Sequence, residues 1–319
     1  MSTVAAPTIT QRKKRHNWQK TLVIVTFAIL PLFLLILFTY LPFAKMIQFS
    51  LYDMSYTKNR GYVGLNNYVK IFSKSEYVDA ILLSLYYMVG AVVQLSLALF
   101  FATILSSGIK GGGIFKGIMF FPFLVNGIAI GFIFKFFFTR GFVLDTVLQA
   151  IGFNLDSLPY WLRDQSVNNW SLVFTSVWKY TGQNMVLFIG AIASIDPTLY
   201  EAATIDGANR WQQFWHIILP GIKTVFMLNL ILSITGSLSA FEPAYVVGSM
   251  GANGTATFFI KIHQMAHVSG KVGMACAMAM VLMALILIFT VLQRLFFRYV
   301  MKDSDNTFNG ASNKAKALW

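Results

Sequence analysis

Few side chains in this sequence have the types and spacing that a reaction centre requires. His263 and His267 are four residues apart and could share a helical face, but Gln264 stands where a zinc protease has glutamate, and no third ligand is evident. We expect a surface helix with two exposed histidines and no metal site. No G-x-x-x-x-G-K-[ST] phosphate loop occurs, and the glycine run 111–113 is expected to be a flexible connection. Because no nucleophile–base or carboxylate pair is apparent, the sequence predicts a chain that is not an enzyme and holds no cofactor of its own.

Polar side chains inside long apolar stretches are stronger candidates for function, because a polar group in lipid is costly. Six such residues are of interest: Asn126, Tyr180, Gln183, Asn184, Asn229 and Ser233. Lys179 precedes Tyr180, and we expect it to pair with an acid on a partner protein or to lie near a water-filled cavity. The alternative for all of these residues is hydrogen bonding and packing between helices.

The elements that would position these residues are membrane-spanning helices. Only 12% of the 319 residues are charged, whereas a soluble protein has about 25%. Five stretches have no charged residue, namely those between Lys20 and Lys45, Asp79 and Lys110, Lys116 and Lys135, Lys223 and Glu242, and Lys271 and Arg294. Each has roughly the 20 residues that a helix needs to cross a bilayer. Continuous apolar runs exclude the alternating strands of a membrane barrel.

A sixth stretch, residues 170–195, is apolar apart from Lys179. The sequence therefore predicts an all-α integral membrane protein with six transmembrane helices, at residues 21–44, 80–106, 115–138, 170–195, 221–242 and 273–298. The longest exposed segments are expected at residues 45–79, 139–169 and 243–272. The last of these has the glycine-rich composition of a loop, so we expect it to lie outside the membrane.

The net charge of +13 is explained by its position in the chain, and nucleic-acid binding is not expected. Five basic residues precede the first predicted helix and five follow the last: Arg12, Lys13, Lys14, Arg15 and Lys20, then Arg294, Arg298, Lys302, Lys314 and Lys316. Cytoplasmic segments attract Lys and Arg in this way, so both termini are predicted to be cytoplasmic. Residues 1–20 and 301–319 are predicted to be polar tails that flank a transmembrane domain at residues 21–300.

The segment at residues 196–220, between the fourth and fifth predicted spans, has strong helix signals. Asp196 is a good N-cap, Pro197 suits the first helical position, and Gly207 can end the helix in a left-handed conformation. A short helix of about ten residues is therefore predicted. A second helical stretch at residues 211–219 is rich in aromatic residues, which favours a helix docked on another surface. Pro220 then marks the start of the fifth span.

This segment resembles the EAA motif of ABC importer permeases. The matching residues are Glu201-Ala202-Ala203, Asp206-Gly207-Ala208, Phe214, Ile217, Leu219 and Pro220. Other parts resemble the carbohydrate (maltose-type) branch of that family: residues 64–68 with Phe72, then Trp178, Gly182 and Met185, then Phe241, Glu242 and Tyr245. The resemblance covers roughly residues 20–300. One departure follows Tyr245, where the branch commonly has Thr-x-Gly-Gly-Pro and residues 247–254 contain no proline.

The resemblance implies a type I ABC importer permease in a bacterial cytoplasmic (inner or plasma) membrane, surrounded by lipid. Its coupling loop would dock on a partner ATPase through Glu201, Ala202, Ala203, Asp206, Gly207, Ala208, Phe214, Leu219 and Pro220. The implied partners are two ATPase subunits that bind ATP and Mg, a second homologous permease in a heterodimer, and an extracytoplasmic solute-binding protein. The implied solute is a sugar or oligosaccharide, and Tyr180, Gln183 and Asn184 are residue types that bind sugars.

Two other functions remain open at this point. The same architecture could import a glycerol phosphate or another polar solute. An ion-coupled secondary transporter is less well supported, because such proteins usually show paired membrane acids or inverted repeats, and no acidic residue is predicted at mid-membrane.

In the implied assembly the partner ATPases hydrolyse the ATP. We therefore expect the isolated chain to hydrolyse none, because it has no phosphate-binding loop. A phosphate-release assay on the purified subunit in detergent measures this directly. Hydrolysis above the level of a buffer blank, retained after a second purification step, would contradict the prediction.

Overall fold

The computed structural model describes residues 18–300, and the chain divides into two units, Met1–Gln48 and Phe49–Trp319. The tails predicted at residues 1–20 and 301–319 lie outside the described residues, except that the first helix already begins at Trp18.

The first unit is helical wherever it is described. It consists of α1 (Trp18–Leu35), the π-helical turn η1 (Ile36–Tyr40) and most of α2 (Leu41–Ser50). The most apolar 18-residue window of the stretch Leu22–Ser50 has a mean hydropathy of 2.9, and none of it is buried. A helix that is hydrophobic on all sides requires lipid or another protein around it. The span predicted at residues 21–44 lies within α1, η1 and α2.

The second unit begins with a short hairpin, which corrects the all-α prediction. Strands β1 (Tyr52–Ser55) and β2 (Lys58–Tyr62) pair antiparallel with Tyr52 opposite Tyr62. The two tyrosine rings meet edge to face with centroids 5.3 Å apart, a cross-strand contact that stabilises a hairpin. The helix α3 (Asn66–Ser73) follows, and the Asn67 amide donates a 2.8 Å hydrogen bond to the carbonyl of Ser50.

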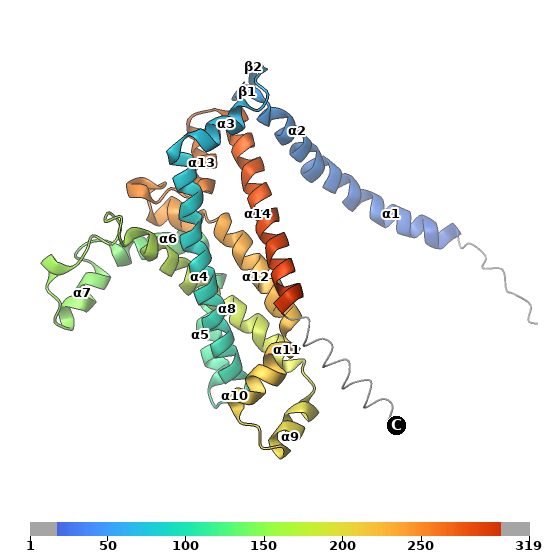
Figure 1. Cartoon of the computed structure of the whole chain (residues 1–319), viewed down its shortest axis with the longest axis vertical. Coiled ribbons are helices and arrows are strands. Elements are labelled where there is room, and N and C mark those ends of the chain that lie inside the picture. Colours follow the sequence, from blue (N-terminus) through green and yellow to red (C-terminus); the bar gives the residue numbers. More distant parts are fainter. Residues whose placement is uncertain (1–17, 301–319) are drawn as a thin grey trace, which may run out of the picture. The chain divides into compact units, whose positions relative to one another are not determined.

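Four helices form the frame of this unit: α4 (Ser75–Ser106), α8 (Asn168–Ala193), α12 (Lys223–Leu238) and α14 (Val272–Val300). Helices α4 and α8 pack along each other, and α12 contacts the other three. Figure 1 shows α4 running from the hairpin and α3 at one end of the unit to α10 at the other. The four frame helices correspond to the spans predicted at residues 80–106, 170–195, 221–242 and 273–298.

The third predicted span, residues 115–138, is two helices and not one. Helix α5 (Gly112–Leu124) and helix α6 (Gly127–Phe138) meet at an angle of 99°. Val125 adopts an extended conformation, and the Asn126 side chain then accepts the backbone N–H of Ile128 as the N-cap of α6. A hydropathy profile shows no such break, because the stretches on both sides of Asn126 are apolar.

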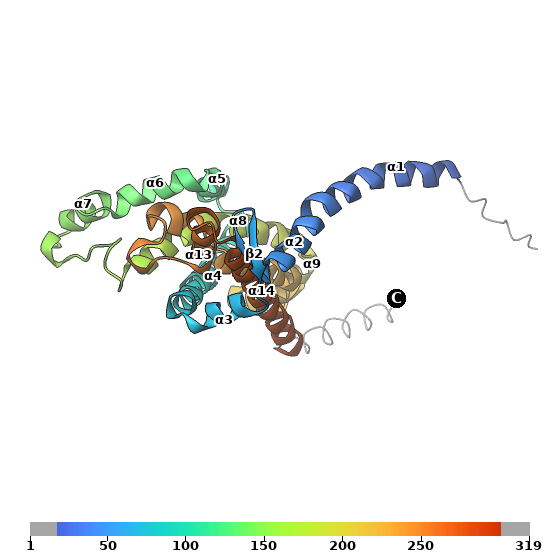
Figure 2. The ribbon, with the colours of Figure 1, turned by 90° about the horizontal axis from the view of Figure 1, so that it is seen from above.

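Helices α5 and α6 continue into α7 (Val143–Ala150) and the 3₁₀ turn η2 (Leu155–Ser157). Seen from above, α5, α6 and α7 follow one another along one side of the unit, and α3 and α14 lie on the other (Figure 2). The buried carboxylate of Asp145 fixes α7 to the loop after it, because it accepts 2.7 Å hydrogen bonds from Trp161 Nε1 and from the Gly141 N–H.

The segment predicted as an exposed loop at residues 243–272 packs into the unit. It contains the π turn η4 (Pro243–Val247), the 3₁₀ turn η5 (Ala252–Gly254), helix α13 (Phe258–His263) and the π turn η6 (Gln264–Val268). Ala244, Val247, Phe258 and Ile260 are at most 1% exposed. The loop composition describes only the turn near Gly251, where several residues have positive φ.

One of the two histidines in this segment is not exposed as predicted. The ring of His263 is partly buried, with its centroid 5.4 Å from that of Phe241 and 5.3 Å from that of Tyr245. His267 is exposed, as predicted. Packing against the two aromatic rings partly buries His263. The sequence pattern did not predict this burial, because the two aromatic residues are about 20 positions away from His263 in the sequence.

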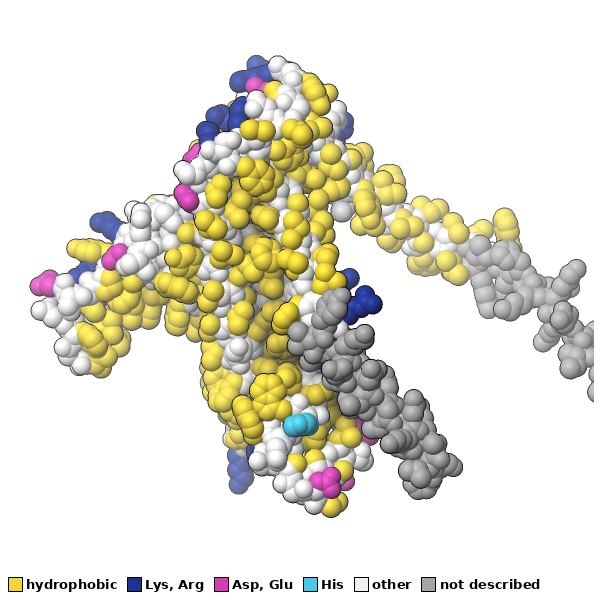
Figure 3. All heavy atoms as spheres, viewed as in Figure 1, with side chains coloured by type: hydrophobic (Ala, Val, Ile, Leu, Met, Phe, Trp, Pro, Cys, Tyr) yellow, Lys and Arg dark blue, Asp and Glu magenta, His cyan; other side chains and the backbone are white. Residues whose placement is uncertain are grey.

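Apolar packing inside the unit is matched by apolar residues on its outside. Leu99 of α4, Phe188 of α8 and Ile222 belong to one buried cluster. Away from the cavity described below, Phe100 and Leu228 are more than half exposed. Figure 3 shows hydrophobic side chains over the middle of the unit, with charged side chains mainly towards the hairpin end and the α9 end. Such a belt is the surface that a bilayer requires.

The close approach of α5 to α8 gives a test of this packing. A Cβ added at Gly182 would overlap the backbone carbonyl of Met119, whereas a Cβ at Gly190 on the same helix would meet open space. We expect Gly182→Ala to lower the free energy of unfolding by about 1–3 kcal/mol, and Gly190→Ala to leave it unchanged or raise it by up to about 1 kcal/mol. Thermal melting of both variants in detergent measures the difference. Equal melting temperatures would contradict the packing.

Candidate functional site

The N-terminal half of the motif segment forms the predicted short helix, α9 (Pro197–Ile205). Oδ1 of Asp196 accepts the backbone N–H of Thr198 at 3.0 Å, and Pro197 opens the helix. This backbone hydrogen bond, assisted by the Thr198 hydroxyl, holds the pKa of Asp196 below its ordinary value. The cap therefore has its full strength above the ordinary carboxyl pKa of about 3.9 and is lost as the pH falls through the lowered value.

The C-terminal end of α9 also follows the prediction. Gly207 has a φ of +76°, the left-handed conformation that ends a helix. The N–H of Ala208 bonds to the carbonyl of Ala203 at 2.8 Å, and the N–H of Gly207 bonds to that of Thr204 at 3.1 Å. These two bonds satisfy carbonyls that the end of a helix leaves free. Both ends of α9 are thus fixed by local hydrogen bonds.

The second stretch begins one residue before the predicted range and has three parts. They are α10 (Arg210–Gln213), the π turn η3 (Phe214–Ile218) and α11 (Leu219–Gly221). Asn209 and Gln212 form a reciprocal capping box, with bonds of 2.9 and 2.8 Å. The sequence analysis missed this pair, although the spacing of a capping residue and Gln three positions later could have identified it.

Some of the motif residues pack against the interior of the protein, and others are exposed on α9. Phe214 and Leu219 pack against the apolar cluster that α4 and α8 share. Glu201 and Ala202 are exposed on α9, and Ile205 is 87% exposed. Between the two helices lies a hollow lined by Ala203, Asp206, Gly207, Ala208, Gln212, Gln213, His216 and Ile217. A rigid helix with small and apolar exposed side chains can be held by another protein.

The polar residues of the long helices surround a cavity of about 660 Å³. Five of the six predicted residues line it: Tyr180, Gln183, Asn184, Asn229 and Ser233. Asn126 is exposed, stands outside this lining and caps α6. The cavity is therefore built where α4, α8 and α12 face one another, and Phe123, residues 240–243 and Phe259 complete its lining.

The lining includes polar residues that the sequence analysis did not select. They are Tyr87, Gln94, Ser176 and Glu242. The hydroxyl of Tyr87 and the Nδ2 of Asn229 are buried and have no hydrogen-bond partner within the described chain. Buried polar groups usually have partners, so these two groups are unsatisfied in this arrangement of the helices. Helical spacing could have identified Ser176, because Tyr180, Gln183 and Asn184 follow it at four, seven and eight positions on the same helix.

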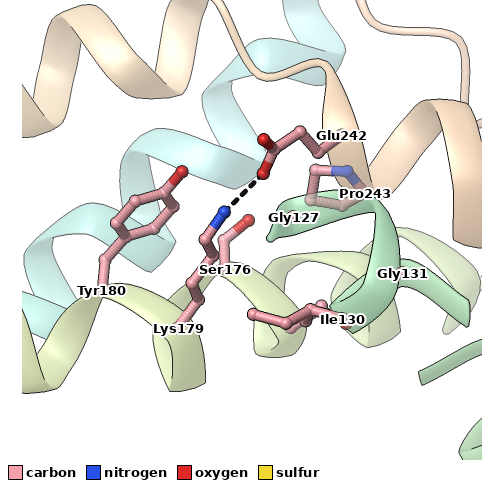
Figure 4. A pocket seen from close by; sticks show the side chains of 9 residues that line it. Gly127, Ile130, Gly131, Ser176, Lys179, Tyr180, Glu242 and Pro243 are labelled. Atoms are coloured by element: carbon pink, nitrogen blue, oxygen red, sulfur yellow. Dashed lines mark hydrogen bonds and ion pairs between the residues drawn. The ribbon is translucent and has the colours of Figure 1, made fainter. Parts of the chain in front are cut away.

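Lys179 forms an ion pair within the chain. Its Nζ lies 2.6 Å from Oε2 of Glu242, and the residue is only 8% exposed. Figure 4 shows the two side chains meeting beside Tyr180, whose ring centroid is 5.2 Å from the ammonium. The prediction that Lys179 pairs with an acid on another protein is thus wrong. The other prediction, a nearby cavity, agrees with the position of Glu242 in the cavity lining.

The carboxylate of Glu242 also touches the break in the third predicted span. A Cβ added at Gly127, the first residue of α6, would overlap this carboxylate. The ion pair therefore joins α8, the start of α6 and the start of η4 (Figure 4). Only glycine permits such an approach without displacement of the carboxylate.

Comparisons with known proteins agree with this arrangement. The family model "Binding-protein-dependent transport system inner membrane component" matches residues 94–302. The multiple sugar-binding transport system permease protein of Streptococcus mutans is 31% identical over 278 residues, 84% of this chain and 92% of that protein. The diacetylchitobiose uptake system permease protein of Streptomyces coelicolor is 28% identical over 295 residues, 88% of this chain and 84% of that protein.

A solved structure shares the fold. A chain of the bacterial alginate ABC transporter, solved with an alginate pentasaccharide-bound periplasmic protein, superposes with a TM-score of 0.77 at 18% identity. The match covers 89% of this chain and 96% of that chain. The chain belongs to the family of binding-protein-dependent transport system inner membrane components, and it is a multi-pass permease subunit of an ABC importer in the cytoplasmic membrane.

Proposed function

We propose that this chain moves a sugar or oligosaccharide, delivered by an extracytoplasmic binding protein, through the cavity between α4, α8 and α12. The observation that supports the proposal most is the polar lining of that cavity, which includes Gln94, Gln183 and Asn184. Sugars need many hydrogen bonds and an aromatic face, which Tyr180 and Phe241 offer. The names of the relatives point to the same class of solute. Membership of this family leaves the ion-coupled secondary transporter without support.

The topology in this proposal has six spans, with both termini and α9 in the cytoplasm. Four helices are long and apolar enough to cross a membrane, and the number rises to six if each bent pair counts as one span. One pair is α5 with α6, and the other is α8 with α9; in this proposal α8 alone is the span of the second pair, and α9 follows it in the cytoplasm. The basic residues at both ends of the sequence favour this orientation. The transmembrane domain would extend over residues 21–300, with tails at residues 1–20 and 301–319.

The segment at residues 196–220 would be the coupling loop, with α9 held in a cleft of the ATPase. Glu201 offers a fixed charge, Ala202 permits close approach, and Ile205 offers an exposed apolar contact. Phe214 and Leu219 would transmit the movement, because they pack against the cluster formed by α4 and α8. Transport requires two states of the helical unit that the ATPases favour in turn.

The remaining parts of the assembly come from other subunits. Two ATPase subunits would bind ATP and Mg and perform all hydrolysis, and this chain would be non-catalytic. A second, homologous permease would complete the pathway in a heterodimer.

Affinity purification of the tagged chain in mild detergent, with mass spectrometry of the proteins that co-purify, tests this assembly. We expect an ATPase and a second six-span protein. Glu201→Lys should reduce ATPase recovery and uncouple transport, because it reverses the exposed charge on α9, while the protein still inserts. Asp156→Lys is the matched control, since Asp156 is also exposed and lies outside the loop. Recovery of the chain alone, under conditions that preserve other complexes, would refute the proposal.

The rigidity of α9 gives a second test. Gly207 has a φ of +76° with no atom near its missing Cβ, so Gly207→Ala introduces backbone strain of about 1 kcal/mol without a clash. We expect amide hydrogen exchange in α9 to become about fivefold faster, and transport per ATP to fall. Gly113→Ala is the control, because Gly113 also faces open space and its φ is not positive. Unchanged exchange in α9 would show that the cap is not needed.

A further inference from the structure

The cavity presents one charged group. Among the described residues that line it, Glu242 alone is charged, and its side chain is 41% exposed. The side chain of Lys179 is only 10% exposed and lines a neighbouring void of about 10 Å³, which has room for no more than one water molecule. Glu242 lines both the cavity and this void, whereas Lys179 lines only the void, so the carboxylate is the charge that the cavity meets.

The carboxylate of Glu242 is held in a fixed position. Oε2 accepts the Lys179 ammonium at 2.6 Å, and the carboxylate rests against Gly127 at the start of α6. The start of a helix favours a negative charge, so both neighbours hold the carboxylate in place. In the part of the chain that the structure describes, Oε1 has no hydrogen-bond partner. One acceptor oxygen is therefore available to a molecule in the cavity.

The neighbouring groups are neutral and suited to hydroxyls. Gln183 and Asn184 line the cavity with amides, and Ser176 and Ser233 line it with hydroxyls. A carboxylate accepts strong, charge-assisted hydrogen bonds from hydroxyl groups. A phosphate or carboxylate on the solute would instead meet a like charge, since no cation of the described lining faces it.

We propose that Glu242 is a specificity-determining residue that selects an uncharged, hydroxyl-rich solute, and that Lys179 is its positioning residue. The proposal rests on the proposed function, in which the cavity is the solute pathway. It names the residue that selects this solute class, and it distinguishes sugars from glycerol phosphates. The competing explanation is that the ion pair only connects α8 to η4. In that case it does not matter which of the two positions carries the negative charge.

The first experiment measures uptake and ATP hydrolysis by the complete transporter, with its binding protein, in proteoliposomes. The probes are maltotriose, arabinotriose, diacetylchitobiose and glycerol 3-phosphate, each radiolabelled. We expect wild type to take up at least one of the sugars and no glycerol 3-phosphate. Glu242→Gln should lower sugar moved per ATP about tenfold, because a neutral amide replaces a charge-assisted acceptor. Glu76→Gln is the control, since Glu76 also pairs with a lysine, Lys261 at 3.5 Å, but does not line the cavity.

The charge-swapped double variant K179E/E242K separates the two explanations. It restores an ion pair at the same place but puts the ammonium towards the cavity. We expect it to recover the melting temperature and ATPase assembly that the single variants K179E and E242K lose, and to remain without sugar uptake. Recovery of uptake by the double variant would show that the ion pair only connects α8 to η4, and it would overturn the proposal.

The remaining outcomes separate this inference from the proposed function. Wild-type sugar uptake with Glu242→Gln unchanged would overturn the inference and leave the proposed function intact. Wild-type uptake of glycerol 3-phosphate, or of none of the three sugars, would overturn the proposed function and the inference with it.

Discussion

A polar side chain inside a bilayer must find its partner within the protein, and this constraint organises the helices of the second unit. Gln94 on α4 donates to Ser233 on α12 at 3.3 Å, and Ser237 donates to the carbonyl of Tyr87 at 3.0 Å. Lys179 on α8 reaches Glu242. All of these contacts lie where the helices face one another, so the outer faces remain apolar. The cavity lies in the same place because the polar residues gather there.

The two parts of the site are joined by a single helix. Helix α8 lines the cavity at Tyr180, Gln183 and Asn184 and then ends at Ala193, shortly before Asp196 caps α9. The cluster around Phe188 packs Phe214 and Leu219 against the same helix. Tyr200 of α9 packs against this cluster as well, so packed side chains connect α9 to the helices that line the cavity. Close-packed protein interiors move between discrete arrangements more readily than they deform.

Local features could be predicted well from the sequence. The limits of α9 depend on Asp196, Pro197 and Gly207, whose preferences act within a few residues. The frame helices were found because lipid requires long apolar runs. Five of the six polar residues selected in those runs line the cavity, since a polar residue in such a helix turns towards other polar groups. Their contact with a solute is still a prediction.

The sequence by itself determined the class of protein, the long apolar helices, the capped helix and five of the polar residues that line the cavity, because each depends on composition or on neighbours in the chain. The tertiary structure decided the 99° break between α5 and α6, the burial of Ala244, Val247, Phe258 and Ile260, and the partner of Lys179. Lys179 and Glu242 are 63 residues apart. Their pairing depends on how α8 packs beside η4, and hydropathy and capping signals contain no information about which distant segments meet.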